Sequence, residues 1–147
     1  MSTHGTILSD VTAQTLETLC FFYPDAEITD VQEQAPLDGA MSVRFEGPFN
    51  GRVVVRLSGG LLPLLASNML GDADGDLHMQ RDALAEVANV ICGNLMPLIG
   101  GAESAFVLRS PIPVIDLPHV SPHPAATVRF GLEQMGRVDV MLYLDPT

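Results

Sequence analysis

Four residues in one short segment, Asp82, Glu86, Asn89 and Gly93, combine residue types and spacing that suit a chemical site. Their spacing would place them on one stripe of a helix, about 60° wide. An amide such as that of Asn89 can accept a hydrogen bond from a water molecule and hold that water in line with a leaving group. In phosphoryl transfer, positioning and charge neutralisation do most of the work. The stripe therefore suits phosphoryl hydrolysis if a partner brings the metal ion and the phosphoryl group.

The alternative is that this stripe only solvates a surface helix, as the polar face of any amphipathic helix does. The residue types favour a site, because Asn is a mediocre helix former and Gly costs about 1 kcal/mol inside a helix. Ala85 and Gly93 add almost no bulk beside Glu86 and Asn89, which leaves room for a second macromolecule. The opposite side of the helix is apolar and is expected to pack on a core, through Leu84, Val87, Ala88, Ile91, Leu95 and Leu98.

The stripe belongs to a helix expected from Gln80 to about Leu98, which Gly100-Gly101 should end. The pattern of apolar and turn residues predicts the other elements. In chain order these are a helix over Ile7 to Phe22, a strand over Ala26 to Gln34, a hairpin of Ala40 to Glu46 with Gly51 to Leu57, a helix over Leu61 to Leu70, a turn over Gly71 to Asp76, a strand over Ala105 to Arg109, a proline-rich crossing loop over Ser110 to Pro124, and a hairpin of Thr127 to Glu133 with Arg137 to Leu144.

The two expected hairpins share a sequence motif. Val43-Arg44-Phe45 and Gly51-Arg52-Val53-Val54-Val55 return 85 positions later as Val128-Arg129-Phe130 and Gly136-Arg137-Val138-Asp139-Val140. Chance similarity between two strand pairs is the alternative to duplication. We expect residues 1–147 to form a single domain with an internal pseudo-repeat, at about 7–57 and 80–144. The duplicated helix–strand–hairpin units would form an antiparallel sheet with long helices on one face, an α+β fold.

The first helix carries a weaker version of the stripe. Asp10, Gln14 and Glu17 keep the spacing of Asp82, Glu86 and Asn89, but the second and third residue types differ. If the duplication is real, the first helix holds a decayed copy of the site.

The composition narrows the classes of function and partner. The chain has 147 residues, of which 47% are hydrophobic and 17% charged, so it is expected to be globular. A net charge of −11 opposes binding to nucleic acid or to anionic lipid. The longest uncharged run, Val87 to Ala102, is too short and polar to span a bilayer, and no secretion leader opens the chain. Cys20 and Cys92 form no CxxC motif, so we expect reduced thiols in a cytoplasmic protein.

Two other groups of residues are weaker candidates. Asp72, Asp74 and Asp76 have the spacing of a calcium loop, but Leu77 and Ala83 stand where that loop needs Gly and Glu. His119 and His123 lie in the proline-rich loop, where a zinc site would need further ligands. We therefore expect no metal site and no cofactor on this chain. The sequence also contains no P-loop and no nucleophile elbow.

The stripe Asp82-x3-Glu86-x2-Asn89-x3-Gly93, followed by Pro111 and Pro113, resembles the signature of the CheC/CheX/FliY family of chemotaxis phosphatases. One intact site beside a decayed one is most similar to the CheX branch. The resemblance implies a homodimer that docks on the phosphorylated aspartate of a CheY-type receiver domain. It implies that Asn89 orients the attacking water, that Glu86 pairs with a receiver lysine, and that Asp82, Ala85 and Gly93 support binding. Mg²⁺, by the same resemblance, belongs to the receiver.

Two alternatives to catalysis stay open. The chain could be a receiver-binding or flagellar-switch-like adaptor that has kept the fold without turnover. It could also be a structural dimer module. The intact pair of Glu86 and Asn89 favours the phosphatase.

Overall fold

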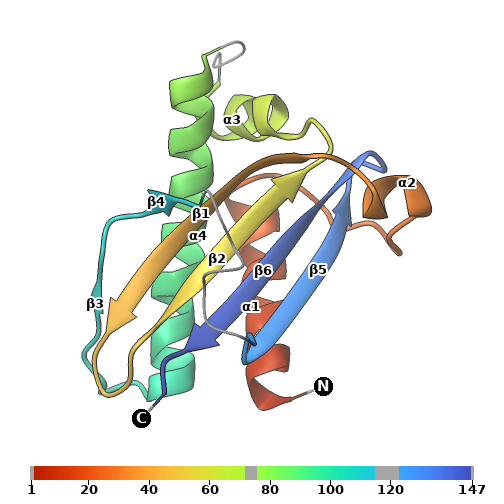
Figure 1. Ribbon diagram of the computed structural model, residues 1–147. Helices are drawn as coiled ribbons and strands as arrows, with labels where there is room; N and C mark the ends of the chain where they lie inside the picture. Colours follow the sequence, from red (N-terminus) through yellow and green to blue (C-terminus); the bar gives the residue numbers. More distant parts are fainter. Residues whose placement is uncertain (1, 72–75, 115–122, 147) are drawn as a thin grey trace.

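The computed structural model describes residues 2–71, 76–114 and 123–146. Figure 1 shows an antiparallel sheet with two long helices on one of its faces. The strand order is β3-β1-β2-β6-β5, and β4 also pairs with β1. The four long strands are β1 (Leu37–Glu46), β2 (Gly51–Ser58), β5 (Ala126–Leu132) and β6 (Gly136–Leu144). The expected α+β fold is confirmed.

The two long helices, α1 (Thr3–Thr18) and α4 (Leu77–Gly100), run in opposite directions behind the sheet in Figure 1. The helix α4 packs on β1 and β2, whereas α1 packs on β5 and β6. In the chain, α1 precedes the β1–β2 hairpin and α4 precedes the β5–β6 hairpin. Each long helix therefore covers the hairpin that follows the other helix, and the two halves of the chain are interlocked.

The core lies between the sheet and the helices. Every second residue of each long strand faces it, as period-two alternation requires. The short helix α3 (Leu62–Leu70) adds Leu62, Leu65 and Ala66 to the same core. Burial of each large side chain contributes about 1.5–3 kcal/mol. Fully buried members include Leu8, Phe22, Val43, Phe45, Val53, Val55, Ile91, Leu95, Val140 and Leu142.

The strand expected over Ala26 to Gln34 is wrong. The segment contains the short helix α2 (Asp30–Glu33), which begins with a reciprocal capping box. The Thr29 hydroxyl accepts a hydrogen bond from the Gln32 backbone N–H at 3.2 Å, and the Gln32 side-chain oxygen accepts one from the Thr29 N–H at 2.9 Å. This pairing satisfies donors that a helix start would otherwise leave open. The Thr-x-x-Gln spacing is typical of a capping box and could have predicted this helix, but the strand prediction rested on other residues of the segment.

The first helix ends at Thr18, and not at Phe22 as expected. Phe21 adopts a left-handed backbone conformation with φ +56°. This turns the chain so that the Phe22 N–H donates to the Leu16 carbonyl at 2.9 Å, and the Phe22 side chain enters the core. A large residue rarely adopts this conformation, so the sequence gives no sign of this ending.

The expected proline-rich crossing loop is wrong for its first part. Instead of one strand and a loop, the structure has two short strands, β3 (Val107–Leu108) and β4 (Ile112–Pro113), which both pair with β1. They form the edge of the sheet beside α4 (Figure 1). Residues 115–122 of the expected loop, and residues 72–75 of the expected turn before α4, lie outside the described part of the chain.

One helix of the described residues, α4, is long and apolar enough by length and composition to cross a membrane. However, its apolar residues pack on β1 and β2, and charged residues stand on its outer side. These contacts mark α4 as a core helix of the fold.

Candidate functional site

The helix α4, which carries the candidate stripe, has a clear structural start and end. At its start, the Asp76 carboxylate accepts a hydrogen bond from the Met79 backbone N–H at 3.2 Å. At its end, Gly101 adopts φ +93°, a conformation that favours glycine and breaks the helix. Between these caps α4 runs for 24 residues, longer at both ends than expected. The stripe lies well inside the helix, away from fraying ends.

The stripe faces away from the sheet. Asp82, Glu86 and Gly93 are exposed, while Asn89 and Ala85 are half-buried. The opposite side is buried through Leu84, Val87, Ala88, Ile91 and Leu95. The structure thus brings the residues predicted for the site onto one accessible helix face. A macromolecule that docks there would meet a carboxylate and an amide one turn apart.

One residue of the expected apolar face lies elsewhere. Leu98 is 57% exposed and not buried as expected. It lines a hollow of about 240 Å³ between α1 and α4, together with Val90 and Asn94 of α4 and with Gln14 of α1. Leu98 is exposed because this part of α4 faces the neighbouring helix across the hollow. Gln14, a member of the copy that the sequence predicts to be decayed, therefore lies at the border between the two helices.

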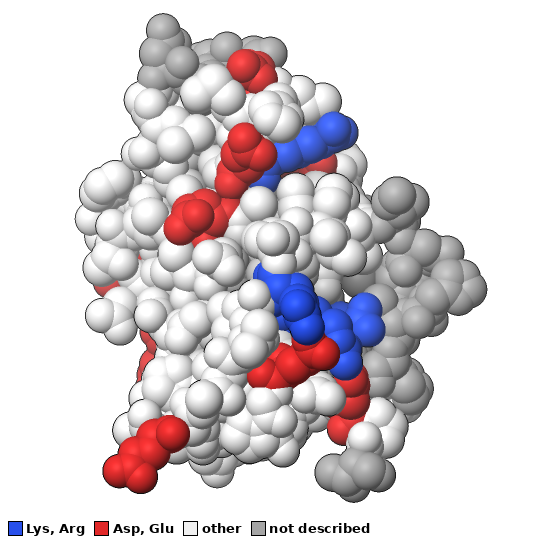
Figure 2. All heavy atoms as spheres, turned by 90° about the vertical axis from the view of Figure 1, so that its left-hand side faces the viewer, with Lys and Arg blue, Asp and Glu red and all other residues white. Residues whose placement is uncertain are grey.

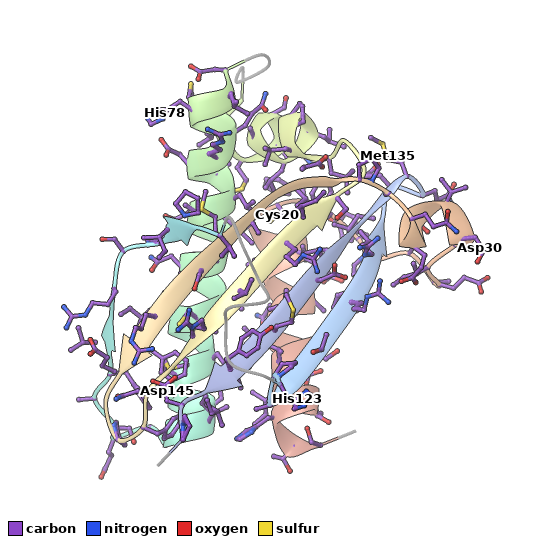
Figure 3. The ribbon with its side chains drawn as sticks, in the orientation of Figure 1. Cys20, Asp30, His78, His123, Met135 and Asp145 are labelled. Atoms are coloured by element: carbon purple, nitrogen blue, oxygen red, sulfur yellow. The ribbon has the colours of Figure 1, made fainter. Side chains whose placement is uncertain are left out.

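His78 extends the stripe by one turn and was missed in the sequence analysis. Its imidazole Nε2 lies 3.5 Å from the Asp82 carboxylate, and both side chains are largely exposed. Figure 3 shows His78 on the first turn of α4, directed away from the sheet. The signal was available, because His78 stands four residues before Asp82, the spacing of neighbours on one helix face.

Gly93 leaves open space next to the sheet edge. A Cβ atom built on Gly93 would lie 3.8 Å from Leu108 Cδ2, which is an ordinary contact distance. The fold itself therefore does not require glycine at this position. Its small size instead leaves space at the C-terminal end of the stripe, next to Asn89. Figure 2 looks onto this side of the molecule, over which acidic side chains are spread.

No metal-binding group is found among residues 2–71, 76–114 and 123–146: no three His, Cys, Asp or Glu side chains come together there. Asp76, the last member of the calcium-loop candidate, instead caps α4. Asp72, Asp74 and His119 lie outside the described residues.

The two cysteines are buried structural residues. Cys20 and Cys92 are free thiols without solvent exposure, and both belong to the core. Burial raises the pKa of each thiol to about 12, because the charged thiolate loses its hydration there. At neutral pH both thiols stay protonated, which excludes them as nucleophiles.

Comparison with known proteins agrees with this fold. Residues 40–125, more than half of the chain, match the family model described as chemotaxis phosphatase CheX. The chain belongs to the CheX family. No curated protein sequence matches the chain.

Solved structures of chemotaxis proteins share the fold over nearly the whole chain. A chemotaxis protein from Desulfovibrio vulgaris Hildenborough aligns with a TM-score of 0.75 and 20% identity, covering 97% of this chain and 96% of its own. CheX from Vibrio vulnificus aligns with a TM-score of 0.70 and 17% identity, covering 98% and 97%. CheX from Borrelia burgdorferi, solved as a CheX–CheY–BeF₃–Mg²⁺ complex, aligns with a TM-score of 0.65 and 15% identity, covering 96% and 97%.

Proposed function

We propose that this protein hydrolyses the aspartyl phosphate of a phosphorylated CheY-type receiver domain. The observation that carries the proposal is the position of Glu86 and Asn89, one turn apart on the outer face of α4, in a chain of the CheX family. Hydrolysis of this phosphate would end the signal that the receiver transmits.

The Borrelia burgdorferi relative supports a receiver as the partner, because it was solved bound to CheY with BeF₃ and Mg²⁺. In such a complex BeF₃ stands in for the phosphoryl group on the receiver aspartate. We place the Mg²⁺ of this reaction on the receiver. The chain would then contribute only side chains that position and orient.

In the proposed reaction, the Asn89 side chain holds a water molecule in line with the bond between phosphorus and the aspartate oxygen. The water oxygen forms a bond to phosphorus, the bond to the aspartate oxygen breaks, and the products are inorganic phosphate and a free carboxylate. An amide is suited to this role because it orients the water without removing a proton itself. The half-buried position of Asn89 limits its side-chain motion before docking.

Glu86 has a different role in this proposal. Its exposed carboxylate would pair with the receiver's lysine as the two surfaces close. An ion pair formed in a partly dried interface contributes both to affinity and to orientation. Asp82 would add negative charge on the same side, and the small residues Ala85 and Gly93 would allow the receiver backbone to approach.

The decisive experiment measures the decay of phosphate on candidate receiver domains, with and without this protein. The wild-type protein should accelerate decay, and Asn89→Ala should remove roughly 10²-fold or more of that acceleration. The variant should still bind a BeF₃-loaded receiver, because the amide acts mainly in the transition state.

An adaptor of the same fold would give a different result. It would bind the BeF₃-loaded receiver but leave the decay of receiver phosphate unchanged, and Asn89→Ala would then have no effect on decay. The proposed reaction also places the protein in the cytoplasm together with its receiver. Two buried free thiols are compatible with that reducing compartment.

A further inference from the structure

Three arginines, two on strands and one just after a strand, converge on one hollow at the edge of the sheet, near β3 and β4. Arg44 on β1 lies directly opposite Arg52 on β2, and Arg109 follows β3. The Arg109 backbone N–H donates to the Arg44 carbonyl at 2.8 Å, which fixes the two strands beside each other. The hollow, of about 340 Å³, is completed by Ser42, Ser110 and Ile112. We call it the arginine hollow.

The charge of the arginine hollow is not balanced by the described residues. Arg44 pairs with Asp145 at 2.6 Å, and Arg109 pairs with Glu46 at 2.6 Å. Within the described part of the chain, no carboxylate forms an ion pair with Arg52. Figure 2 shows basic side chains gathered in one place with acidic ones beside them, and Figure 3 places Asp145 near the end of β1. Counted over the described residues alone, the three arginines and the two paired carboxylates leave a net charge of +1 at this hollow, on a chain whose net charge is −11.

The facing positions of Arg44 and Arg52 are themselves informative. Like charges directly opposite each other on adjacent strands destabilise a sheet, and the ion pair of Arg44 with Asp145 offsets only one of these two charges. A bound anion between them would reverse that effect, because two guanidinium groups can each donate paired hydrogen bonds to one phosphate or carboxylate. The basic residues of this chain are all arginine, the side chain best suited to such forked contacts.

The walls of the hollow indicate what kind of anion fits. The arginine stems and Ile112 supply apolar surface, while Ser42 and Ser110 supply hydroxyl groups. The volume lies near the lower end of the range for small-molecule sites, which is about 300–1,000 Å³. We propose that the arginine hollow binds a small organic anion through a phosphate or carboxylate group. This site uses neither Glu86 nor Asn89, so it stands apart from the proposed phosphatase site.

The test is a titration of the purified wild-type protein with inorganic phosphate, adenosine monophosphate and citrate, at constant ionic strength. Calorimetry should show saturable binding of at least one of these probes at millimolar or lower concentration. The three probes separate a phosphate site from a carboxylate site, and adenosine monophosphate tests whether an apolar body improves affinity. Absence of saturable binding with all three would overturn the proposal.

A matched pair of variants locates the binding. Arg52→Gln should weaken affinity roughly tenfold or more, the loss expected for charge-assisted hydrogen bonds. Arg81→Gln removes the same charge from an exposed position on α4 outside the hollow, and should bind as the wild type does. Equal losses in both variants would mean that the anion responds to overall charge, which contradicts a built site.

The stability of the unliganded variant gives an independent measurement. Because Arg52→Gln removes a like-charge neighbour of Arg44, the variant should melt no lower than the wild type in the absence of anions. A clearly lower melting temperature would show that Arg52 holds a structural partner instead of a ligand, and would overturn the proposal.

Discussion

Val55 on β2 lies directly opposite Val140 on β6, and the two valines occupy the same place in the two copies of the Gly-Arg-Val motif. Two positions away, Val53 faces Leu142, so the pairing continues symmetrically on both sides. A two-fold axis that relates duplicated units would produce this register. The symmetry supports our proposal that residues 1–147 are one domain built from units at about 7–57 and 80–144.

Glu86→Ala should weaken both receiver binding and turnover. Its carboxylate is proposed to form an ion pair during docking, so its loss should reduce affinity for a BeF₃-loaded receiver roughly tenfold or more. Glu86 is exposed on the outer face of α4, and the variant should therefore melt like the wild type. Binding assays and melting curves measured side by side with Asn89→Ala would separate the two roles. Unchanged affinity would refute the lysine-pairing role of Glu86.

The first helix should be inert in catalysis. Gln14 and Glu17 are exposed on α1, so substituting both by alanine should leave the fold intact. We expect the double variant to dephosphorylate the receiver at a rate near that of the wild type, because the decayed copy lacks an asparagine at its third position. A large loss of rate with unchanged melting would reveal a second working site.

Two glycines of α4 should respond in opposite ways to alanine. Gly93→Ala should raise the free energy of unfolding by about 0.5–1 kcal/mol, since alanine is the better helix former and the added Cβ meets only Leu108 at 3.8 Å. Gly100→Ala should lower it by about 1–3 kcal/mol, because the new Cβ would overlap the Phe106 ring.

Receiver affinity adds a second measurement for Gly93→Ala. If the missing side chain of Gly93 leaves room for the receiver to dock, the stabilised variant should bind the BeF₃-loaded receiver more weakly. A variant that is more stable and binds equally well would mean that the receiver does not approach this part of α4.

Stability should fall with alkaline pH through the buried thiols. Burial raises the pKa of Cys20 and Cys92 from 9.0 to about 12, so above pH 9 the thiols ionise in the unfolded chain but not in the folded one. The unfolded state then holds fewer protons, and each thiol lowers the free energy of unfolding by up to about 1.4 kcal/mol per pH unit. Below pH 9 the two thiols should cause no pH dependence.

Urea unfolding in the presence of a reducing agent, measured on both sides of pH 9, tests this effect. Cys20→Ala and Cys92→Ala should each be less stable overall because of the cavity, but should lose less stability per pH unit than the wild type. If the free energy of unfolding falls equally per pH unit in the wild type and both variants, the thiols do not cause the loss of stability at alkaline pH.

The protein should form a homodimer, as its resemblance to CheX suggests. One side of β5 pairs with β6, while the other side has no strand beside it among the described residues. An open strand edge of this length is a natural place for pairing with a second chain. Sedimentation at micromolar concentration should give about twice 15.7 kDa. A monomer under those conditions would count against the dimer.

Sequence patterns were informative where a single element determines its own structure. The helix that holds Glu86 and Asn89 and the long hairpins follow from periodicity and turn residues. The strand β3 was also expected, although over the longer range Ala105 to Arg109. The strand β4 was not, because Ile112 becomes a strand residue only through pairing with β1. The repeat shows the same limit: Phe45 faces Gly51, whereas Phe130 faces Val138, so the outer strands differ in register by two residues although their sequences align.

The exposure of Asp82, Glu86 and Gly93 followed from the helix pattern, but the half-buried positions of Ala85 and Asn89 did not, and neither did the surroundings of the stripe. The hollow beside Leu98 depends on how α1 lies against α4, which no local pattern encodes. The meeting of Arg44, Arg52 and Arg109 likewise depends on strand register and on the path of the chain after α4.

The interlocked packing of helices and hairpins also limits when the domain can fold during its synthesis. The last strand in the chain, β6, lies between β2 and β5 near the centre of the sheet, and α1 packs on the two strands that are made last. A nascent chain therefore carries α1 with its apolar face uncovered, and β2 with an open edge, until β6 has left the ribosome. Folding of this domain can be completed only after β6 has been synthesised, and a chain truncated before β6 would be a substrate for chaperones and proteases.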